Sequence, residues 1–511
     1  MHAFFSQRRG RRVLLKAGLA FTALAALGAC GQEPETIIAT PPPARPPDQP
    51  TATPAVTPTQ AAPTAVPTAS AAPVLPTSVL PAPSAPLAPP KPRPTVAPAP
   101  PTTGRPQYQG DAQHTGRSPH TGPTSQPALL RTFDTTNPGV DLPDPGWTNP
   151  DIQCSCAIGP DGTIYVGNYL GNVFALRDGA AADKLELAWR FHPPGGTSWH
   201  ATPALSPDGI LYVGFSTGGN GPDARGTFYA LRAPDKGVDA KVVWTADLGP
   251  GRTTSSPTIA PDGAVYALAG QGRLFAFAPD GRTLWSAQTG PTLKSAPALG
   301  PEGQVYVASM DGNLYSVSPP RDGSKEGRVV WKFDFGKNLG SKPLVVAKPP
   351  PAGADGVGTG ASPTVAPDGM VYVGANNSNF YAVDPDGKMA WLFEAEREIA
   401  GIWSTAALGE DGKTLYFTAN KGGVYAVNRE DGALRWQFPV YGSIYSSPTL
   451  DKRGTLYTAS NVGHVFGIDS HGAQKLFDWF GGGPPIWTAP AVRPDGTLVV
   501  GDRTGRVMVL G

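Results

Sequence analysis

The feature that most constrains this chain is a repeat in which a charged residue followed by glycine recurs about every 42 residues between residues 161 and 495. The eight charged positions are Asp161, Asp208, Asp262, Glu302, Asp368, Asp411, Arg453 and Asp495. In residues 361–393, four short runs rich in Val, Tyr and Phe are separated by Asp-Gly or Asn-rich pairs, which tolerate the backbone of tight hairpin turns. A meander of four such strands cannot bury both of its faces alone. The sequence therefore predicts an all-β fold, an eight-bladed β-propeller of four-stranded antiparallel blades.

Tryptophan marks the fourth strand of most repeats. The seven positions are Trp189, Trp244, Trp285, Trp331, Trp391, Trp436 and Trp479. We expect these indole rings to pack between neighbouring blades. The last repeat ends at Gly511 without a fourth strand, but residues 128–134 match residues 329–334, with Arg131 in place of the tryptophan. We therefore predict that this N-terminal strand completes the last blade and closes the ring, which removes exposed sheet edges.

The first hundred residues do not belong to the propeller pattern. Residues 1–30 combine arginines with an apolar stretch, as a targeting segment does. Arg11 and Arg12 resemble a twin-arginine export motif, although an ordinary export signal with extra arginines is an alternative. Residues 27–30 resemble a bacterial lipobox, which implies that Cys30 is the lipid attachment site. Residues 31–105 are rich in Pro, Ala and Thr and indicate a disordered stalk, which leaves residues 106–511 for the propeller.

Composition excludes several classes of function. The net charge is +1, so nothing points to nucleic acid as a partner, and we expect a monomer. The seven histidines show no metal-binding spacing, so no metal site is predicted. Cys154 and Cys156 could be a free buried pair, which we favour, or a strained disulfide.

Several repeats resemble the pyrroloquinoline-quinone (PQQ)-like repeat family of propellers. The resemblance lies in residues 426–436, which place an Ala, an Asn, a Gly and a closing Trp as that family does, and in the Ser-Pro pairs at Ser256, Ser362 and Ser447. A lead-in segment, residues 108–119, resembles the one that precedes such propellers. The chain is also similar to the propeller lipoproteins of the outer-membrane β-barrel assembly machinery, from which its long stalk and twin-arginine-like signal depart.

The resemblance raises the question of a PQQ-dependent dehydrogenase. Enzymes of that kind have a calcium site of Glu, Asn and Asp, a catalytic Asp and adjacent cysteines beside the quinone. Here Cys154 and Cys156 are separated by one residue, and nearly all repeated aspartates fall in turns. We therefore expect no catalytic residue and no cofactor, with PQQ and Ca²⁺ as the alternative.

A set of aromatic and basic residues stands just before the innermost strands of the blades, where a propeller has the rim of its central channel. The candidate binding residues are Trp199, His200, Arg252, Lys294, Trp403, Tyr445 and Trp487. Rings and cations together could hold a peptide, a glycan or a flat cofactor. The alternative is that the rings only plug the channel.

These observations predict a non-catalytic binding or scaffold module that is lipid-anchored in the bacterial cell envelope and faces outside the cytoplasm. Its partner would be a protein, peptide or glycan. A PQQ-dependent dehydrogenase and a surface sensor or adhesin that binds glycan or peptide are the alternatives.

Overall fold

A computed structural model of the chain describes residues 104–140, 149–194, 196–197, 201–217, 223–292, 294–338, 358–395 and 401–511. All of them belong to the second of the chain's two units, Pro89–Gly511. The predicted signal with Arg11, Arg12 and Cys30, and the predicted stalk as far as residue 103, lie outside the described residues. The described part of the chain contains no helix that is long and apolar enough to span a bilayer.

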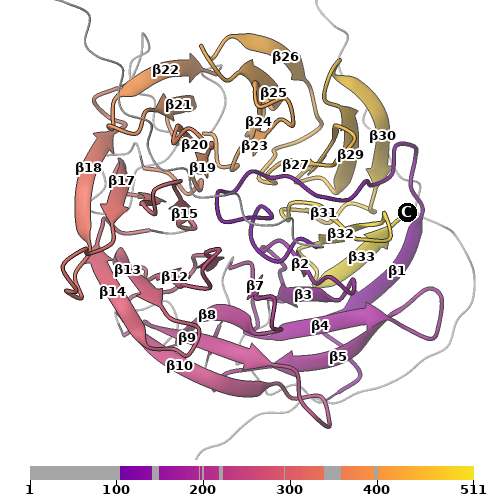
Figure 1. Cartoon of the computed structure of the whole chain (residues 1–511). Helices are drawn as coiled ribbons and strands as arrows, with labels where there is room; N and C mark the ends of the chain where they lie inside the picture. Colours follow the sequence, from indigo (N-terminus) through magenta and orange to yellow (C-terminus); the bar gives the residue numbers. More distant parts are fainter. Residues whose placement is uncertain are drawn as a thin grey trace, which may run out of the picture. The chain divides into compact units, whose positions relative to one another are not determined.

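The described strands form eight antiparallel sheets arranged around a centre, which confirms the predicted eight-bladed propeller (Figure 1). Blades 1 to 4 consist of β2 (Ala157–Ile158), β3 (Ile164–Gly167), β4 (Val173–Asp178) and β5 (Leu185–Phe191); β6 (Gly196–Thr197), β7 (Ala204–Leu205), β8 (Leu211–Thr217), β9 (Arg225–Arg232) and β10 (Lys241–Pro250); β11 (Thr258–Ile259), β12 (Val265–Leu268), β13 (Arg273–Phe277) and β14 (Thr283–Gln288); and β15 (Ala298–Leu299), β16 (Val305–Ala308), β17 (Asn313–Ser318) and β18 (Arg328–Asp334).

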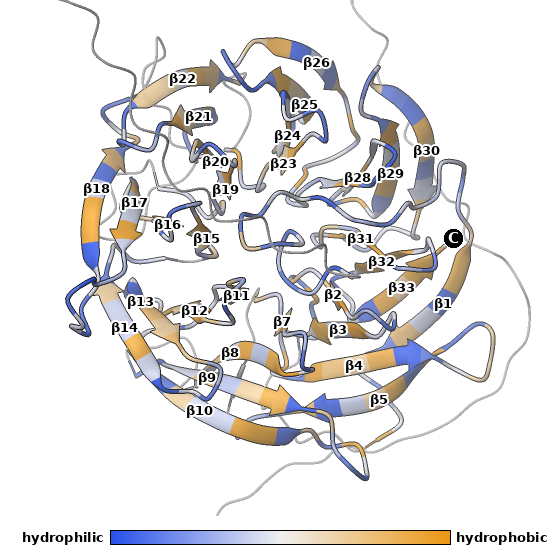
Figure 2. Ribbon diagram, in the orientation of Figure 1, coloured by the Kyte–Doolittle hydropathy of each residue, from blue (hydrophilic) through white to orange (hydrophobic). Residues whose placement is uncertain are grey.

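Blades 5 to 8 repeat the arrangement. They consist of β19 (Thr364–Val365), β20 (Val371–Gly374), β21 (Asn379–Val383) and β22 (Met389–Glu394); β23 (Ala407–Leu408), β24 (Thr414–Ala419), β25 (Gly423–Asn428) and β26 (Leu434–Phe438); β27 (Thr449–Leu450), β28 (Thr455–Ala459), β29 (His464–Asp469) and β30 (Gln474–Phe480); and β31 (Ala491–Val492), β32 (Leu498–Gly501), β33 (Arg506–Leu510) and β1 (Leu129–Asp134). Figure 2 shows apolar residues on many of the strands, and hydrophilic residues in the connecting turns and on parts of outer strands such as β26 and β30.

Blade 2 differs from the predicted four strands by one extra short strand. Strands β8 and β9 run further than their equivalents, and β6 pairs with the far end of β8 through Gly196 and Thr217. Strand β8 ends at Thr217 and β9 begins at Arg225, and the residues between them belong to a repeat that is longer than the period of about 42 residues. The longer hairpin offers unpaired backbone groups, and β6 binds them.

The N-terminal strand closes the ring as predicted. Strand β1 pairs antiparallel with β33, and Arg131 stands opposite Val509, where the equivalent blades have a tryptophan. Its guanidinium Nε lies 3.6 Å from the carboxylate of Asp178 in blade 1. The ring of Phe133 packs 5.8 Å from that of Phe174, also in blade 1, so the last and first blades share an apolar core.

The fourth-strand tryptophans reach into the next blade along the chain. The indole Nε1 donates to the carbonyl of Pro279 from Trp244 (2.8 Å), of Pro385 from Trp331 (2.9 Å), of Arg429 from Trp391 (2.8 Å) and of Ser470 from Trp436 (3.0 Å). In blade 7 the register gives a different result. Phe477, opposite Gly467, holds the position equivalent to these tryptophans, and Trp479 stands two residues further, opposite Val465.

A ring of hydroxyl groups explains the Ser-Pro pairs at the start of the inner strands. We call the residue in the Ser place of these pairs the ring position. Its backbone N–H in one blade donates to the Ser or Thr hydroxyl at the ring position of the next blade. The donor and acceptor pairs are Ser155 and Thr202, Thr202 and Ser256, Ala296 and Ser362, Ser362 and Thr405, Thr405 and Ser447, and Ala489 and Ser155. The ring is interrupted where Ala296 and Ala489 provide no hydroxyl. These bonds hold the starts of neighbouring inner strands level with one another along the central axis of the propeller.

The lead-in segment runs from blade to blade around the inner strands. Backbone N–H groups of five inner strands donate to its carbonyls: Leu205 to Pro106, Leu299 to Ala112, Val365 to Gln113, Leu408 to Thr115 and Leu450 to Gly116. Arg105 pairs with Ile158 of blade 1 and donates from Nη1 to the carbonyl of Pro490 in blade 8. One continuous segment therefore binds the centre of the ring from inside.

Candidate binding site at the channel mouth

The hydroxyl ring defines which residues line the mouth of the channel. In each blade, the residue two positions before the ring position comes from the same place in the repeat. We call this set the mouth residues: Gln153, Thr254, Lys294, Gly360, Trp403, Tyr445 and Trp487. Counted back from Thr202, the position in blade 2 is His200, which lies outside the described residues, as does Trp199.

Three aromatic mouth residues and one lysine are in contact. The Tyr445 ring lies edge-on to Trp403, with centroids 6.0 Å apart, and 4.9 Å from the ring of Trp487. The ammonium Nζ of Lys294 is 5.6 Å from the centre of Trp403 and 5.5 Å from that of Trp487. Lysine and indole faces attract each other at such distances. These four side chains come from blades 4, 6, 7 and 8, whose inner strands surround the centre in Figure 1.

Gly360 leaves the space that this cluster uses. A Cβ atom at this position would lie 3.7 Å from Trp403 Cε3 and 3.8 Å from Lys294 Cβ. Any longer side chain would have to share the space between the lysine stem and the indole. The missing side chain in blade 5 therefore lets blades 4 and 6 meet across it.

The electrostatic environment of the mouth is positive. Burial, followed by the charge of Arg503, lowers the pKa of Lys294 from its ordinary 10.5 to about 8. Arg503 stacks 4.3 Å from the centre of Trp487 and its Nη2 lies 2.6 Å from the carboxylate of Asp151, to which the side-chain amide of Gln153 also donates (3.0 Å). Among the described residues, no carboxylate pairs with Lys294. Its positive charge is met by the faces of Trp403 and Trp487.

Asparagines in the turns after β20, β24 and β28 support the aromatic rings. Trp487 Nε1 donates to Asn461 Oδ1 of blade 7 (2.6 Å), and Asn420 Nδ2 of blade 6 donates to the Tyr445 hydroxyl (3.3 Å). Each ring is thus held by an asparagine of the preceding blade. Asn376 of blade 5 has the equivalent place beside Trp403.

The third asparagine and ring, Asn376 and Trp403, are not joined by a hydrogen bond. Within the described ranges, three buried polar atoms at this point have no partner: Trp403 Nε1, Asn376 Oδ1 and Asn420 Oδ1. Gln153 Oε1, in blade 1, is also buried without a hydrogen-bond partner. The mouth therefore offers one buried donor and several buried acceptors that the protein leaves unused in this part of the chain.

The structure brings together Lys294, Trp403, Tyr445 and Trp487 of the predicted set. Arg252 lies two residues before the mouth position of blade 3, which belongs to Thr254, and its charge acts on Tyr169. The sequence reading overlooked Arg503 and the three asparagines. An asparagine recurs in the same turn of three successive repeats, and this recurrence could have revealed the asparagines, whereas no such pattern marks Arg503.

Three observations on the described residues bear on the alternative of a calcium-bound quinone. No group of three or more His, Cys, Asp or Glu side chains in the described ranges could hold a metal ion. Asp151 is already bound by Arg503 and Gln153. Cys154 and Cys156 are free and buried, and burial raises the pKa of both thiols, that of Cys154 to about 11.

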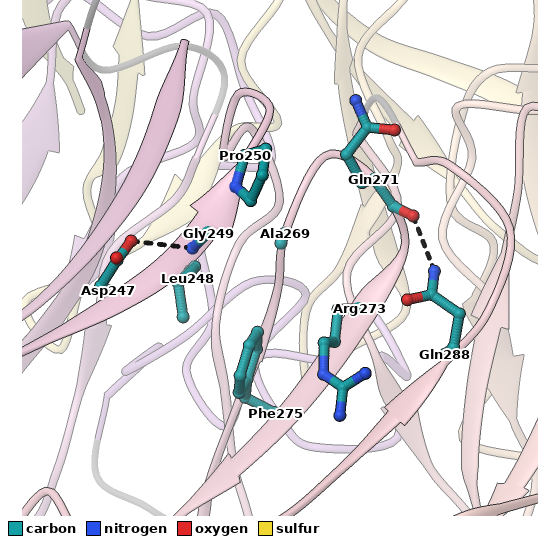
Figure 3. Close-up of a pocket in the computed structure, with 9 residues that line it drawn as sticks. All are labelled: Asp247, Leu248, Gly249, Pro250, Ala269, Gln271, Arg273, Phe275 and Gln288. Atoms are coloured by element: carbon teal, nitrogen blue, oxygen red, sulfur yellow. Dashed lines mark hydrogen bonds between the residues drawn. The ribbon is translucent and has the colours of Figure 1, made fainter. Parts of the chain in front are cut away.

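A cleft away from the mouth carries no comparable chemistry. It lies between blades 2 and 3 and is lined by residues that include Asp247, Gln271, Arg273 and Gln288 (Figure 3). Asp247 accepts from the Gly249 N–H, Gln288 donates to the Gln271 carbonyl, and Arg273 donates to Ser286 and Glu326. Each of these polar groups therefore already has a hydrogen-bond partner within the chain.

Comparisons with known proteins agree with the propeller architecture. The family described as outer membrane protein assembly factor BamB matches residues 178–325 and 270–510. The crystal structure of BamB from Moraxella catarrhalis superimposes with a TM-score of 0.50 at 15% identity, over 76% of this chain and 98% of that one. A quinohemoprotein alcohol dehydrogenase from Comamonas testosteroni gives a TM-score of 0.58 at 12% identity, over 81% of each chain. At these identities the likeness shows the fold alone.

One curated relative is an enzyme. Tetrathionate hydrolase of Acidithiobacillus ferrooxidans is 26% identical over 161 residues, which are 31% of this chain. The match spans only 24% of that enzyme.

Proposed function

This chain belongs to the family of the outer membrane protein assembly factor BamB, and from this premise we propose that it is a non-catalytic binding module of the bacterial cell envelope. In this proposal Cys30 carries the lipid anchor, the Pro-rich stretch between it and the lead-in segment forms the stalk, and the channel mouth captures the partner. The observation that carries the proposal is the cluster of Lys294, Trp403, Tyr445 and Trp487, which presents a cation between two indole faces.

Binding is favoured over chemistry because the mouth residues that the structure describes offer contact groups for a ligand, and none of them is a carboxylate or a histidine. Indole faces and a desolvated cation provide stacking and charge, which are the means by which such sites recognise ligands. A general acid or base would need a carboxylate or histidine within reach of the substrate, and Asp151 is neutralised by Arg503.

The test is capture of envelope proteins by the affinity-tagged full chain, solubilised from membranes. Trp403→Ala combined with Trp487→Ala should abolish capture of the partners bound by the wild type, while the melting temperature changes little. Phe480→Ala is the matched control, because this ring is 56% exposed on the outer strand β30. A large fall in melting temperature in the double variant would mean that the rings are channel plugs, and undiminished capture would place the partner elsewhere.

The dehydrogenase alternative has a separate readout. The same preparation is incubated with PQQ and Ca²⁺. A new bound chromophore together with dye reduction would overturn the non-catalytic proposal.

A further inference from the structure

Trp403 and Asn376, which are not bonded to each other, indicate what kind of group the site accepts. The indole N–H of Trp487 and the hydroxyl of Tyr445 each have an asparagine partner, whereas Trp403 Nε1 and Asn376 Oδ1 have none among the described residues. Leaving a buried donor or acceptor unpaired costs stability, because the group loses its hydrogen bonds to water without gaining others. A cluster that served only to fill the channel would gain nothing from such groups, since apolar side chains of the same size would avoid the cost.

The unused groups specify complementary chemistry. Trp403 Nε1 can only donate, so it calls for an acceptor, and the positive Lys294 ammonium favours an acceptor with negative charge. Asn376 and Asn420 present carbonyl oxygens, which call for N–H donors. A carboxylate satisfies the first two groups with a charge-assisted hydrogen bond. A neighbouring amide satisfies the others.

We propose that the channel mouth binds the free C-terminal end of a peptide, with its carboxylate on Lys294 and Trp403 and its backbone N–H groups on Asn376 and Asn420. At the C-terminal end of a peptide the carboxylate and the last backbone N–H are attached to the same Cα, so the two groups are presented together. A neutral glycan provides no negative charge, and an internal peptide segment provides no carboxylate from its backbone. The rings of Tyr445 and Trp487 form the apolar wall for the terminal side chain.

Charge around the site agrees with this assignment. The second cation at the mouth, Arg503, is already paired with Asp151 and stacked on Trp487, so Lys294 is the group left to meet a ligand. Burial is the main cause of the lowered pKa of Lys294, and the positive charge of Arg503 lowers it further. The inference rests on the proposed function, because it concerns the same mouth, and it adds the identity of the recognised group.

The experiment measures binding of two probes to the full-length protein by calorimetry. The probes are N-acetylated tetrapeptides of the same sequences ending in Ala or Leu, one set with a free carboxylate and one with a C-terminal amide. The free acids should bind at least about 30-fold more tightly than the amides. Lys294→Met should weaken the acids by at least about 10-fold and leave the amides unchanged.

Two further variants separate the site from general effects. Trp403→Phe keeps a ring but removes the N–H, and it should weaken the acids several-fold. Lys332→Met is the matched control, because this lysine lies over the Tyr315 ring at 5.6 Å on the outer strand β18 and should not affect binding.

The outcomes distinguish the inference from the proposed function. Equal binding of acid and amide that is lost in the Trp403 and Trp487 double variant would overturn the carboxylate assignment and keep the mouth as a binding site. No binding of either probe would also overturn the assignment. Loss of envelope-protein capture in the double variant is measured independently and decides the proposed function.

Discussion

Single glycines decide how closely the fourth-strand tryptophans approach the next blade. A Cβ atom would lie 2.7 Å from the Trp244 ring at Gly281, 2.7 Å from Trp331 at Gly387 and 2.5 Å from Trp391 at Gly432. All three glycines have positive φ in the turn between the third and fourth strands. The residue that permits the turn is thus also the surface on which the indole lies, which links turn geometry to packing between blades.

Gly432→Ala should therefore destabilise the protein more than a turn substitution alone. The matched control is Gly412→Ala, where φ is +62° and nothing lies within 4 Å of the new Cβ. The control bears only the cost of the left-handed backbone, about 1–2 kcal/mol. Gly432→Ala adds overpacking against Trp391, about 1–3 kcal/mol more. Urea unfolding of both variants measures the difference, and equal midpoints would contradict the packing role of Gly432.

At the scale of elements, the lead-in segment acts as a tie between blades that are distant in sequence. His114 is fully buried, with Nδ1 donating to the Pro363 carbonyl of blade 5 at 3.0 Å and Nε2 lying 3.4 Å from the Thr258 hydroxyl of blade 3. Because the carbonyl can only accept, the proton resides on Nδ1. The Thr258 hydroxyl donates its proton to the Pro297 carbonyl at 2.7 Å, so the neutral ring is held mainly by burial and by the hydrogen bond from Nδ1.

Acid should weaken the fold through this histidine. Burial lowers the pKa of His114 from 6.5 to about 4, so the unfolded chain takes up the proton first as the pH falls. The free energy of unfolding should decline between pH 6.5 and about 4. In His114→Gln this part of the decline should be absent, whereas the control His471→Gln, whose side chain is 78% exposed, should retain it. Parallel stability curves for wild type and His114→Gln would refute the assignment.

For the whole molecule, the apolar core is divided among the interfaces between blades. In the described residues there are eight apolar clusters, and each joins side chains from two neighbouring blades, with Ala112 of the lead-in segment added to the one between blades 3 and 4. No blade has a core of its own, so each depends on both neighbours, as in other repeat proteins. The interface between blades 8 and 1 has no fourth-strand tryptophan, and β1 provides Phe133 and Arg131 instead.

Removing one side chain at this closing interface should affect the entire ring. Phe133→Ala removes a ring that is 8% exposed and should cost about 3–5 kcal/mol. Leu129→Ala on the same strand, at 45% exposure, should stay within about 0.5 kcal/mol. Denaturant unfolding followed by tryptophan fluorescence, which reports on every blade, is the measurement. A loss confined to blade 8, with the other blades unchanged, would argue against a closed cooperative ring.

The sequence by itself determined the number of blades, their turns and the strand that closes the ring. These features depend on local chemistry, namely Asp-Gly turns and strand-length apolar runs repeated at a fixed spacing. Only the tertiary structure decided that Phe477 rather than Trp479 holds the equivalent position in blade 7, because strand register is set by pairing partners. The same holds for the mouth, where Lys294 meets Trp487 across the ring and the space left by Gly360 lets the lysine reach Trp403. Contacts between residues almost two hundred positions apart follow from how the ring closes, and no local pattern encodes them.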